Sequence, residues 1–156
     1  MQLLASEEYG LRCLLRVACG DDGTPVSISC IAEAEGLSPE YTAKLMRELR
    51  LGGLVKSVRG AEGGYRLARA ATEIDVWTAL RVLGGEFFPD GFCACHPGQQ
   101  KECVRASDCS IRALWRRVKA ALRETLQGIT LEDLRRDEHA MGAWLDPVSL
   151  LPSVQS

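Results

Sequence analysis

Apolar side chains recur every three or four residues in five stretches of the chain, and glycine closes each stretch. This spacing is typical of helices that bury one face. The longest stretch carries its apolar stripe at near-heptad spacing. The predicted helices are residues 3–19, a short helix that follows Ser27 or Ser29 and ends at Gly36, a helix from Ser38-Pro39 to Arg50, residues 74–83, and residues 110–127.

A hairpin is predicted directly after the third helix. Residues 54–58 alternate apolar and polar side chains, residues 59–64 are rich in glycine, and residues 65–68 have the pattern of a return strand. The two helices before it are joined by a tight turn at Gly36, as in a helix–turn–helix. The expected fold is therefore mainly α with a small β-hairpin, a winged helix–turn–helix followed by a long helix.

Charge is distributed unevenly along the chain. The 156 residues suit one domain or a small domain with an arm, and the net charge is only -2. Residues 38–69 nevertheless hold seven basic and three acidic side chains, a local charge of +4. A basic patch on an acidic protein suits the phosphates of nucleic acid. A helical domain that binds protein, with solvated charges, is the alternative.

The winged-helix prediction gives candidate DNA contacts. The third helix would enter the major groove, and Arg59 at the hairpin tip would reach the minor groove. Tyr41 could instead belong to the core, and Glu40 could simply favour the N-terminus of its helix. The candidates on the helix are Ser38, Glu40, Tyr41, Lys44 and Arg47.

Cysteine is the most informative residue type in this sequence. Four of the seven cysteines form the pattern Cys93-x-Cys95-His96-x6-Cys103-x5-Cys109. Separated thiolates favour an iron–sulfur cluster over zinc, whose sites usually contain closer cysteine pairs, while a thiol redox switch and inert cysteines stay as alternatives. The other three are expected to be structural, small buried side chains: Cys13, Cys19 and Cys30.

Several classes of protein are disfavoured. We expect neither a membrane span nor a signal peptide, which predicts a cytoplasmic protein in which disulfides are uncommon. The sequence contains no Cys-x-x-Cys, phosphate-binding loop or catalytic triad, so an enzyme is not expected. An electron-transfer or thiol-redox protein is the rival from another class, but it leaves the basic hairpin unexplained.

The sequence resembles the Rrf-two family of bacterial winged-helix regulators over about residues 1–127. The resemblance rests on these segments: Glu8-Tyr9-Gly10-Leu11-Arg12, Ile31-Ala32-Glu33, Leu37-Ser38-Pro39-Glu40-Tyr41, residues 53–60, residues 63–67, and Cys103-x5-Cys109-x5-Trp115. It implies a homodimer formed through the helix after Cys109. It also implies a 2Fe–2S or 4Fe–4S cluster on three cysteines, of which we favour 2Fe–2S.

The cluster ligands implied by the resemblance are Cys103, Cys109 and one earlier cysteine. Cys93 is favoured as that ligand, while Cys95 and His96 are further candidates. In some members an acid near the N-terminus of the partner subunit is the fourth ligand, and Glu8 occupies the matching place.

These expectations divide the chain by role. The predicted parts are a DNA-binding domain at residues 1–85, a cluster-binding loop at 86–109, a dimerisation helix at 110–128, and a short helix with a mobile tail at 129–156. A two-fold dimer would read a pseudo-palindromic operator with half-sites about 34–36 Å apart. Cluster state would then change operator affinity, through a coupling typically worth about 5–150-fold.

Overall fold

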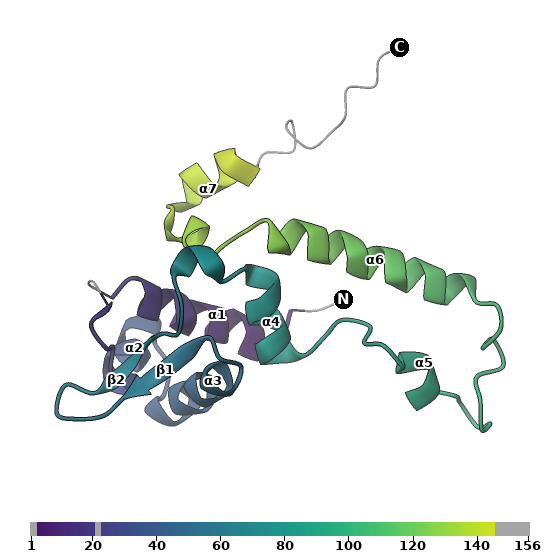
Figure 1. The fold of residues 1–156 in the computed structure, drawn as a ribbon, viewed down its shortest axis with the longest axis horizontal. Helices are drawn as coiled ribbons and strands as arrows, with labels where there is room; N and C mark the ends of the chain where they lie inside the picture. Colours follow the sequence, from purple (N-terminus) through teal and green to yellow (C-terminus); the bar gives the residue numbers. More distant parts are fainter. Residues whose placement is uncertain (1–2, 21–22, 146–156) are drawn as a thin grey trace, which may run out of the picture.

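Helices dominate the computed structural model, which describes residues 3–20 and 23–145 (Figure 1). The sheet in this part of the chain has two antiparallel strands, which form a hairpin. The α-helices are α1 (Ala5–Ala18), α2 (Ile28–Glu35), α3 (Pro39–Leu51), α4 (Val76–Gly84), α5 (Phe92–Cys95), α6 (Ser110–Gln127) and α7 (Glu138–Leu145). The strands are β1 (Val55–Val58) and β2 (Gly64–Leu67), and the 3-10 turns are η2 (Ala71–Glu73) and η3 (Asp133–Arg135).

The predicted helix–turn–helix is confirmed as α2 and α3. The Ser27 hydroxyl accepts a hydrogen bond from the Cys30 amide at 3.2 Å, which makes Ser27 the cap of α2. Gly36 ends α2 with a φ of 66°, a left-handed conformation that favours glycine. Ser38 then caps α3 by accepting from the Tyr41 amide at 3.2 Å.

The hairpin pairs Val55 with Leu67 at one end and Val58 with Gly64 at the other. A third extended segment joins it, because Val26 and Tyr65 exchange backbone hydrogen bonds of 2.8 and 2.9 Å. A side chain at Gly64 would collide with the Val26 backbone. Glycine at this position therefore lets the segment before α2 lie directly against the wing.

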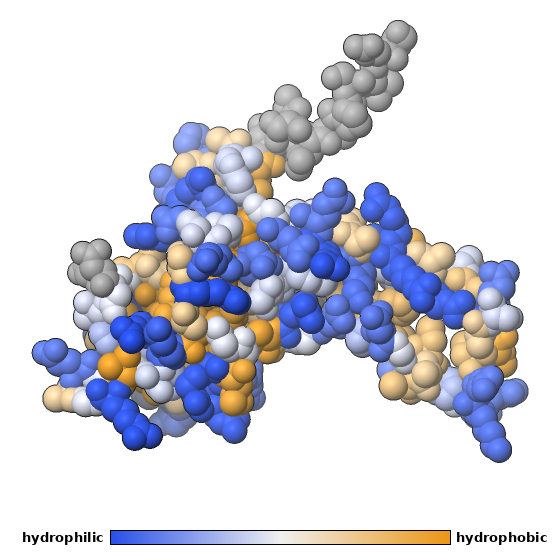
Figure 2. Space-filling model, in the orientation of Figure 1, coloured by the Kyte–Doolittle hydropathy of each residue, from blue (hydrophilic) through white to orange (hydrophobic). Residues whose placement is uncertain are grey.

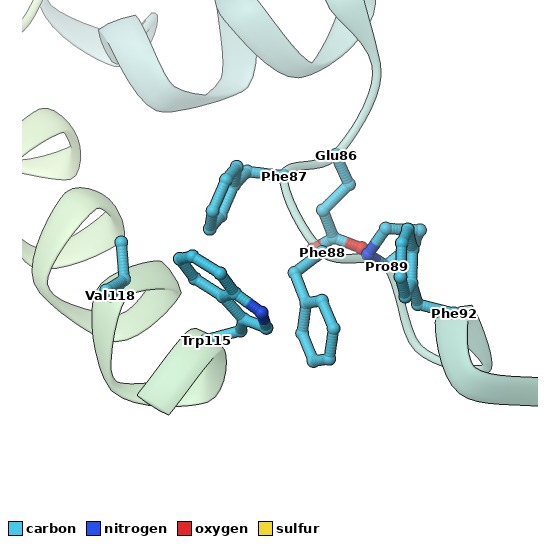
Figure 3. Close-up of a pocket in the computed structure, with 7 residues that line it drawn as sticks. All are labelled: Glu86, Phe87, Phe88, Pro89, Phe92, Trp115 and Val118. Carbon is cyan, nitrogen blue, oxygen red and sulfur yellow. The ribbon is translucent and has the colours of Figure 1, made fainter. Parts of the chain in front are cut away.

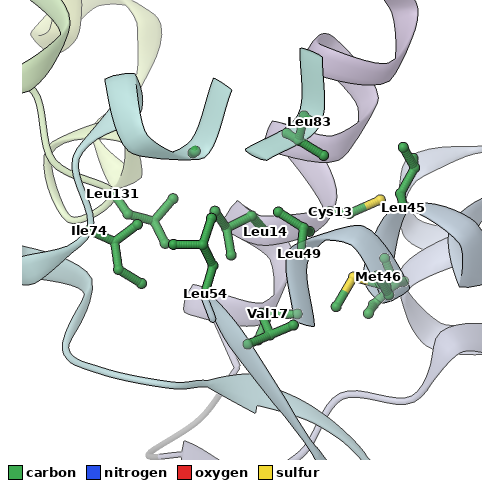
Figure 4. Close-up of a cluster of buried hydrophobic side chains, with 13 residues drawn as sticks. Cys13, Leu14, Val17, Leu45, Met46, Leu49, Leu54, Ile74, Leu83 and Leu131 are labelled. Atoms are coloured by element: carbon green, nitrogen blue, oxygen red, sulfur yellow. The ribbon is translucent and has the colours of Figure 1, made fainter. Parts of the chain in front are cut away.

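The core lies where α1, α3, α4 and β1 meet (Figure 4). Its largest fully buried side chains come from separate elements and include Leu14, Ile31, Leu45, Met46, Leu49, Leu54, Ile74 and Leu131. Burying such side chains is worth roughly 1.5–3 kcal/mol each. Leu45, Met46 and Leu49 of α3 are fully buried, and Tyr41, for which the sequence left a core position open, packs at the edge as a half-buried residue.

The chain returns to this core after α6. Ile129 and Leu131 are buried, and their backbones pair with the start of α4 through Val76 N to Ile129 O at 2.9 Å and Leu131 N to Ile74 O at 2.8 Å. The sequence pattern assigned residues 129–156 to a separate C-terminal part and gave no sign of this return. The segment is therefore a structural piece of the winged domain.

Some sequence predictions are corrected. Leu3 and Leu4 are exposed, because α1 begins at Ala5 where the Glu7 carboxylate accepts from the Leu4 amide at 2.7 Å. Only Cys13 of the three expected buried cysteines is buried. Cys19, which follows the last residue of α1, and Cys30, in the first turn of α2, are exposed.

The C-terminal part also differs in detail from its prediction. The expected acidic helix after Thr130 is the single turn η3, and the separate helix α7 follows it. The tail from Pro147, predicted to be mobile, lies outside the described residues. No helix in the described ranges has the length and apolar character needed to cross a membrane.

A long arm and helix extend from the winged domain. Residues 85–109 leave the end of α4, form the single turn α5, and return at the far end of α6 (Figure 1). The described residues of α6 include no buried side chain, although its C-terminal half packs beside α4. Ile111, Leu114 and Trp115 are 52%, 55% and 40% exposed, so the N-terminal half of the predicted apolar stripe is largely open to solvent in a single chain.

Candidate functional site

The first candidate surface is basic and lies on α3 and the hairpin. Its cations are solvent-exposed, and Figure 2 shows hydrophilic side chains over this end of the molecule. Among residues 3–20 and 23–145, none of these cations has a carboxylate within ion-pairing distance. This basic surface consists of Lys44, Arg47, Arg50, Lys56, Arg59, Arg66 and Arg69.

The predicted contact residues fall into two groups. Glu40, Lys44, Arg47 and Arg59 are exposed. Ser38 is exposed but caps α3. Tyr41 is half-buried and its ring meets that of Tyr9 edge-on, with centroids 6.2 Å apart and planes at 83°. Two of the six candidates therefore also have structural roles.

Arg12 is a residue whose role sequence reasoning did not assign. Its Nε lies 2.9 Å from Glu35 Oε2, and its Nη2 donates to the Glu35 carbonyl at 3.1 Å. The guanidinium also lies 5.5 Å from the centroid of the Tyr9 ring. Arg12 thus fastens α1 to the last turn of α2, immediately before the turn that orients α3. Arg12 belongs to the N-terminal segment on which the family resemblance rests, but nothing in that segment indicated its contact with Glu35.

The second candidate region is the cysteine arm, residues 85–109. Cys93 and Cys95 belong to the single turn α5, where Cys93 is half-buried and Cys95 is exposed. Cys103 is half-buried in the irregular stretch that follows. Cys109 caps α6, and its Sγ accepts from the Arg112 amide at 3.4 Å. Cys109 therefore links the end of the arm to the first turn of α6.

The arm fits a cluster in donor chemistry but not in geometry. Four thiols within one short segment are the donor type that iron–sulfur clusters use. In the described part of the chain, however, no three His, Cys, Asp or Glu side chains are close enough together to hold a metal ion. Glu8 is exposed on α1, whereas Glu7 packs against Gly84, where the arm begins.

Aromatic side chains join the arm to α6. Phe87 meets Trp115 edge-on at 6.2 Å, and Phe92 lies 5.1 Å from Phe88. His96 stacks on Phe92 at 4.1 Å, and its Nδ1 is 2.8 Å from the Phe92 carbonyl oxygen, so this ring nitrogen is already engaged. Between arm and helix is a cavity of about 550 Å³ (Figure 3), lined by Glu86, Phe87, Phe88, Pro89, Phe92, Trp115 and Val118.

Cys13 differs from the arm cysteines because it is buried in the core. Burial, aided by the nearby Glu35 charge, raises the pKa of Cys13 to about 11. Because the thiolate is the reactive form, Cys13 is unreactive at neutral pH. The candidate reactive thiols are therefore the exposed and half-buried ones.

Comparisons with known proteins identify the family. The Rrf2 family, described as an iron-dependent transcriptional regulator, matches residues 4–137. The protein Rrf2 of Nitratidesulfovibrio vulgaris is 37% identical over 140 residues, covering 88% of this chain and 89% of that protein.

Two solved structures share both fold and sequence. CymR of B. subtilis, described as a global cysteine regulator, has a TM-score of 0.70 and 33% identity, covering 88% of this chain and 99% of that one. IscR of T. potens has a TM-score of 0.67 and 36% identity, covering 86% of this chain and 85% of that one. These matches confirm the winged-helix architecture predicted from the sequence. The chain therefore belongs to the Rrf2 family of DNA-binding transcriptional regulators and is not an enzyme.

Proposed function

We propose that this regulator acts as a homodimer on a pseudo-palindromic operator, and that an iron–sulfur cluster on its cysteine arm changes operator affinity. The observation that carries the proposal is the position of the arm. Its four thiols lie in the segment that joins α4 of the winged domain to α6. A change in the arm is therefore communicated along the backbone to both parts.

The DNA contacts follow from the basic surface. α3 inserts into the major groove, where Lys44 and Arg47 contact phosphates or guanine edges and Glu40 can accept from cytosine. Arg59 at the hairpin tip contacts the minor groove. Ser38 and Tyr41 orient the start of α3, and each can also contact a phosphate from its outer side.

The dimer forms through α6. Its exposed Ile111, Leu114 and Trp115 present an apolar surface that a second α6 would cover. A two-fold axis beside α6 places two copies of α3 on the same side of the DNA. Half-sites about 34–36 Å apart then match the two reading helices.

The cluster is held by Cys93, Cys103 and Cys109, and we favour a 2Fe–2S type. Cys95, His96 or Glu8 of the other protomer supplies the fourth ligand. Such a cluster supplies a centre that responds to oxidants, nitric oxide or iron supply. The chain contributes sulfur donors, and the Cys109 Sγ accepts a hydrogen bond from the Arg112 amide at the start of α6. The iron-dependent description of the family and the cytoplasmic setting expected from the sequence both favour this use of the cysteines.

Anaerobic purification tests the proposal. The protein should be brown or red, contain iron and acid-labile sulfide, and elute as a dimer. A duplex selected from a random library should bind the cluster-loaded and cluster-free forms with affinities that differ by at least about 5-fold.

Other results contradict the proposal in distinct ways. A colourless protein with stoichiometric zinc indicates a structural metal. A colourless metal-free protein whose binding changes only with thiol oxidation indicates a thiol or disulfide switch. Equal affinity of the two forms across a range of salt concentrations rejects cluster-controlled binding.

A further inference from the structure

A charged side chain of α6 fastens the start of the cysteine arm. Lys119 Nζ lies 3.2 Å from Glu86 Oε1 and 3.6 Å from Asp90 Oδ1, and it donates to the Phe88 carbonyl at 3.3 Å. The Lys119 side chain is only 18% exposed. One partly buried ammonium thus binds three successive points of the segment that leads to Cys93.

The three contacts differ in strength. Asp90 is fully exposed, so solvent screens its attraction to Lys119. Glu86 is 29% exposed and its oxygen is closer, so this pair is screened less. The main connection between α6 and the arm is therefore Glu86–Lys119.

Glu86 also extends the connection to the winged domain. Its Oε1 lies 3.9 Å from Nε of Arg81, which belongs to α4. One carboxylate oxygen is thus shared by cations of the two helices that the arm joins. α4 packs on α6 and α3, so Glu86 connects the start of the arm, through Arg81 and α4, to the helix that packs on the reading head.

The backbone beside this contact is strained. Phe88 is the one described residue other than glycine with a positive φ, 48°. Such a conformation is disfavoured for a bulky side chain and persists only where its surroundings hold it. Here Lys119 binds the Phe88 carbonyl, and the Phe88 side chain lines the same cavity as Phe87 and Trp115 (Figure 3). Loss of Lys119 would release this segment.

We propose that Lys119 and Glu86 are positioning residues that hold the start of the arm against α4 and α6. They keep Cys93 partly covered and transmit the state of the arm to the reading head through Arg81. The first part concerns the fold of the chain alone. The transmission to DNA rests on the proposed function.

Cysteine alkylation tests the first part without any metal. Chelator-treated, reduced full-length protein is exposed to iodoacetamide, and the alkylation rate of each cysteine is measured by mass spectrometry. Lys119→Met and Glu86→Gln should raise the Cys93 rate by about 3- to 10-fold, because a partly buried ion pair restrains local opening. Lys119→Arg, which keeps the charge, should stay within about twofold of wild type.

Internal controls separate loosening of the arm from loss of fold. Arg117→Met removes an exposed cation about 200° round α6 from Lys119 and should leave the Cys93 rate unchanged. Exposed Cys30 should react rapidly and buried Cys13 not at all in every variant. If Lys119→Met makes Cys13 reactive, the fold of that variant is lost. The Cys93 rate in Glu86→Gln, which changes only one charge, then decides whether the ion pair holds the arm. An unchanged Cys93 rate with unreactive Cys13 overturns the proposal.

Operator titration tests the transmission. In wild type, the ratio of operator affinities with and without the cluster measures coupling. Lys119→Met should bring this ratio to within about twofold of one, while Arg117→Met keeps it. A retained ratio in Lys119→Met overturns transmission through this contact. A wild-type ratio of one contradicts the proposed function, and the alkylation result then still decides whether Lys119 holds the arm.

Discussion

At the scale of single residues, Asp133 shows how one carboxylate closes the C-terminal return. The Thr130 hydroxyl donates to Asp133 Oδ2 at 2.6 Å and the Thr130 amide donates at 2.9 Å, while Arg136 donates to Oδ1 at 2.6 Å. These bonds, with the Thr130 hydroxyl first, lower the pKa of Asp133 to about 2. The carboxylate therefore stabilises the turn that follows buried Leu131.

This lowered pKa predicts a loss of stability in acid. The pKa is lower in the folded state than its ordinary value of 3.8, so the unfolded chain binds more protons as pH falls. The stabilisation is complete above about pH 5 and is lost as pH falls towards 2. After allowance for partial exposure, Asp133→Asn should lower the free energy of unfolding by about 1 kcal/mol at pH 7 and by much less at pH 3.

Urea unfolding at pH 7 and pH 3 measures this difference. Glu124→Gln changes an exposed carboxylate without a hydrogen bond or ion pair in the described part of the chain, and is the control. An equal loss at both pH values for Asp133→Asn would show that the carboxylate charge is not the source of the stability.

At the scale of elements, α6 differs from the other long helices. The apolar faces of α1 and α3 are buried by the chain itself, whereas Ile111, Leu114 and Trp115 of α6 remain exposed. The apolar repeat in the sequence is the same for a helix that its own chain buries and for a helix whose apolar face stays exposed. Only the fold shows that the first half of the α6 stripe stays largely exposed within its own described chain.

Leu114→Glu should therefore dissociate the proposed dimer. A charge on the apolar face would be buried without a partner, which costs several kcal/mol. Sedimentation equilibrium should show a monomer, and operator affinity should fall because two linked half-sites become one. Arg116→Glu, about 160° away on the same helix, is the matched control and should remain dimeric. A dimeric Leu114→Glu protein would place the interface elsewhere.

At the scale of the whole molecule, α3 and the hairpin, which hold the basic surface, lie at one end, and the arm and the start of α6 lie at the other (Figure 1). A chain with a net charge of -2 thus carries a local net charge of +4 over residues 38–69. Such a distribution steers the winged end towards DNA phosphates.

Arg59→Ala should weaken binding to all duplexes by a similar factor. Removing one phosphate or minor-groove cation should reduce the slope of log affinity against log salt by about 1. Fluorescence anisotropy at several salt concentrations measures both. Arg105→Ala removes an exposed cation of the arm and should change neither. A slope unchanged by Arg59→Ala would remove the hairpin tip from the interface.

Local patterns in the sequence predicted most elements because their causes are local. Helical spacing, the caps Ser27 and Ser38 and the stop at Gly36 involve only neighbouring residues, so α2, α3 and the hairpin could be predicted from the sequence. The cysteine pattern and the local charge likewise indicated the candidate regions. The DNA contacts and cluster ligands stay predictions that the proposed experiments test.

Contacts between distant segments needed the tertiary structure. Ile129 and Leu131 are buried against segments that are distant in the chain, and Lys119 pairs with Glu86 across 33 positions. The exposure of Cys19 likewise depends on which segments pack near the end of α1. Local periodicity contains no information on which partner a face or charge meets. The sequence by itself thus determined the elements and their chemistry, while the fold decided which of these groups meet, because burial and charge pairing depend on distance in space.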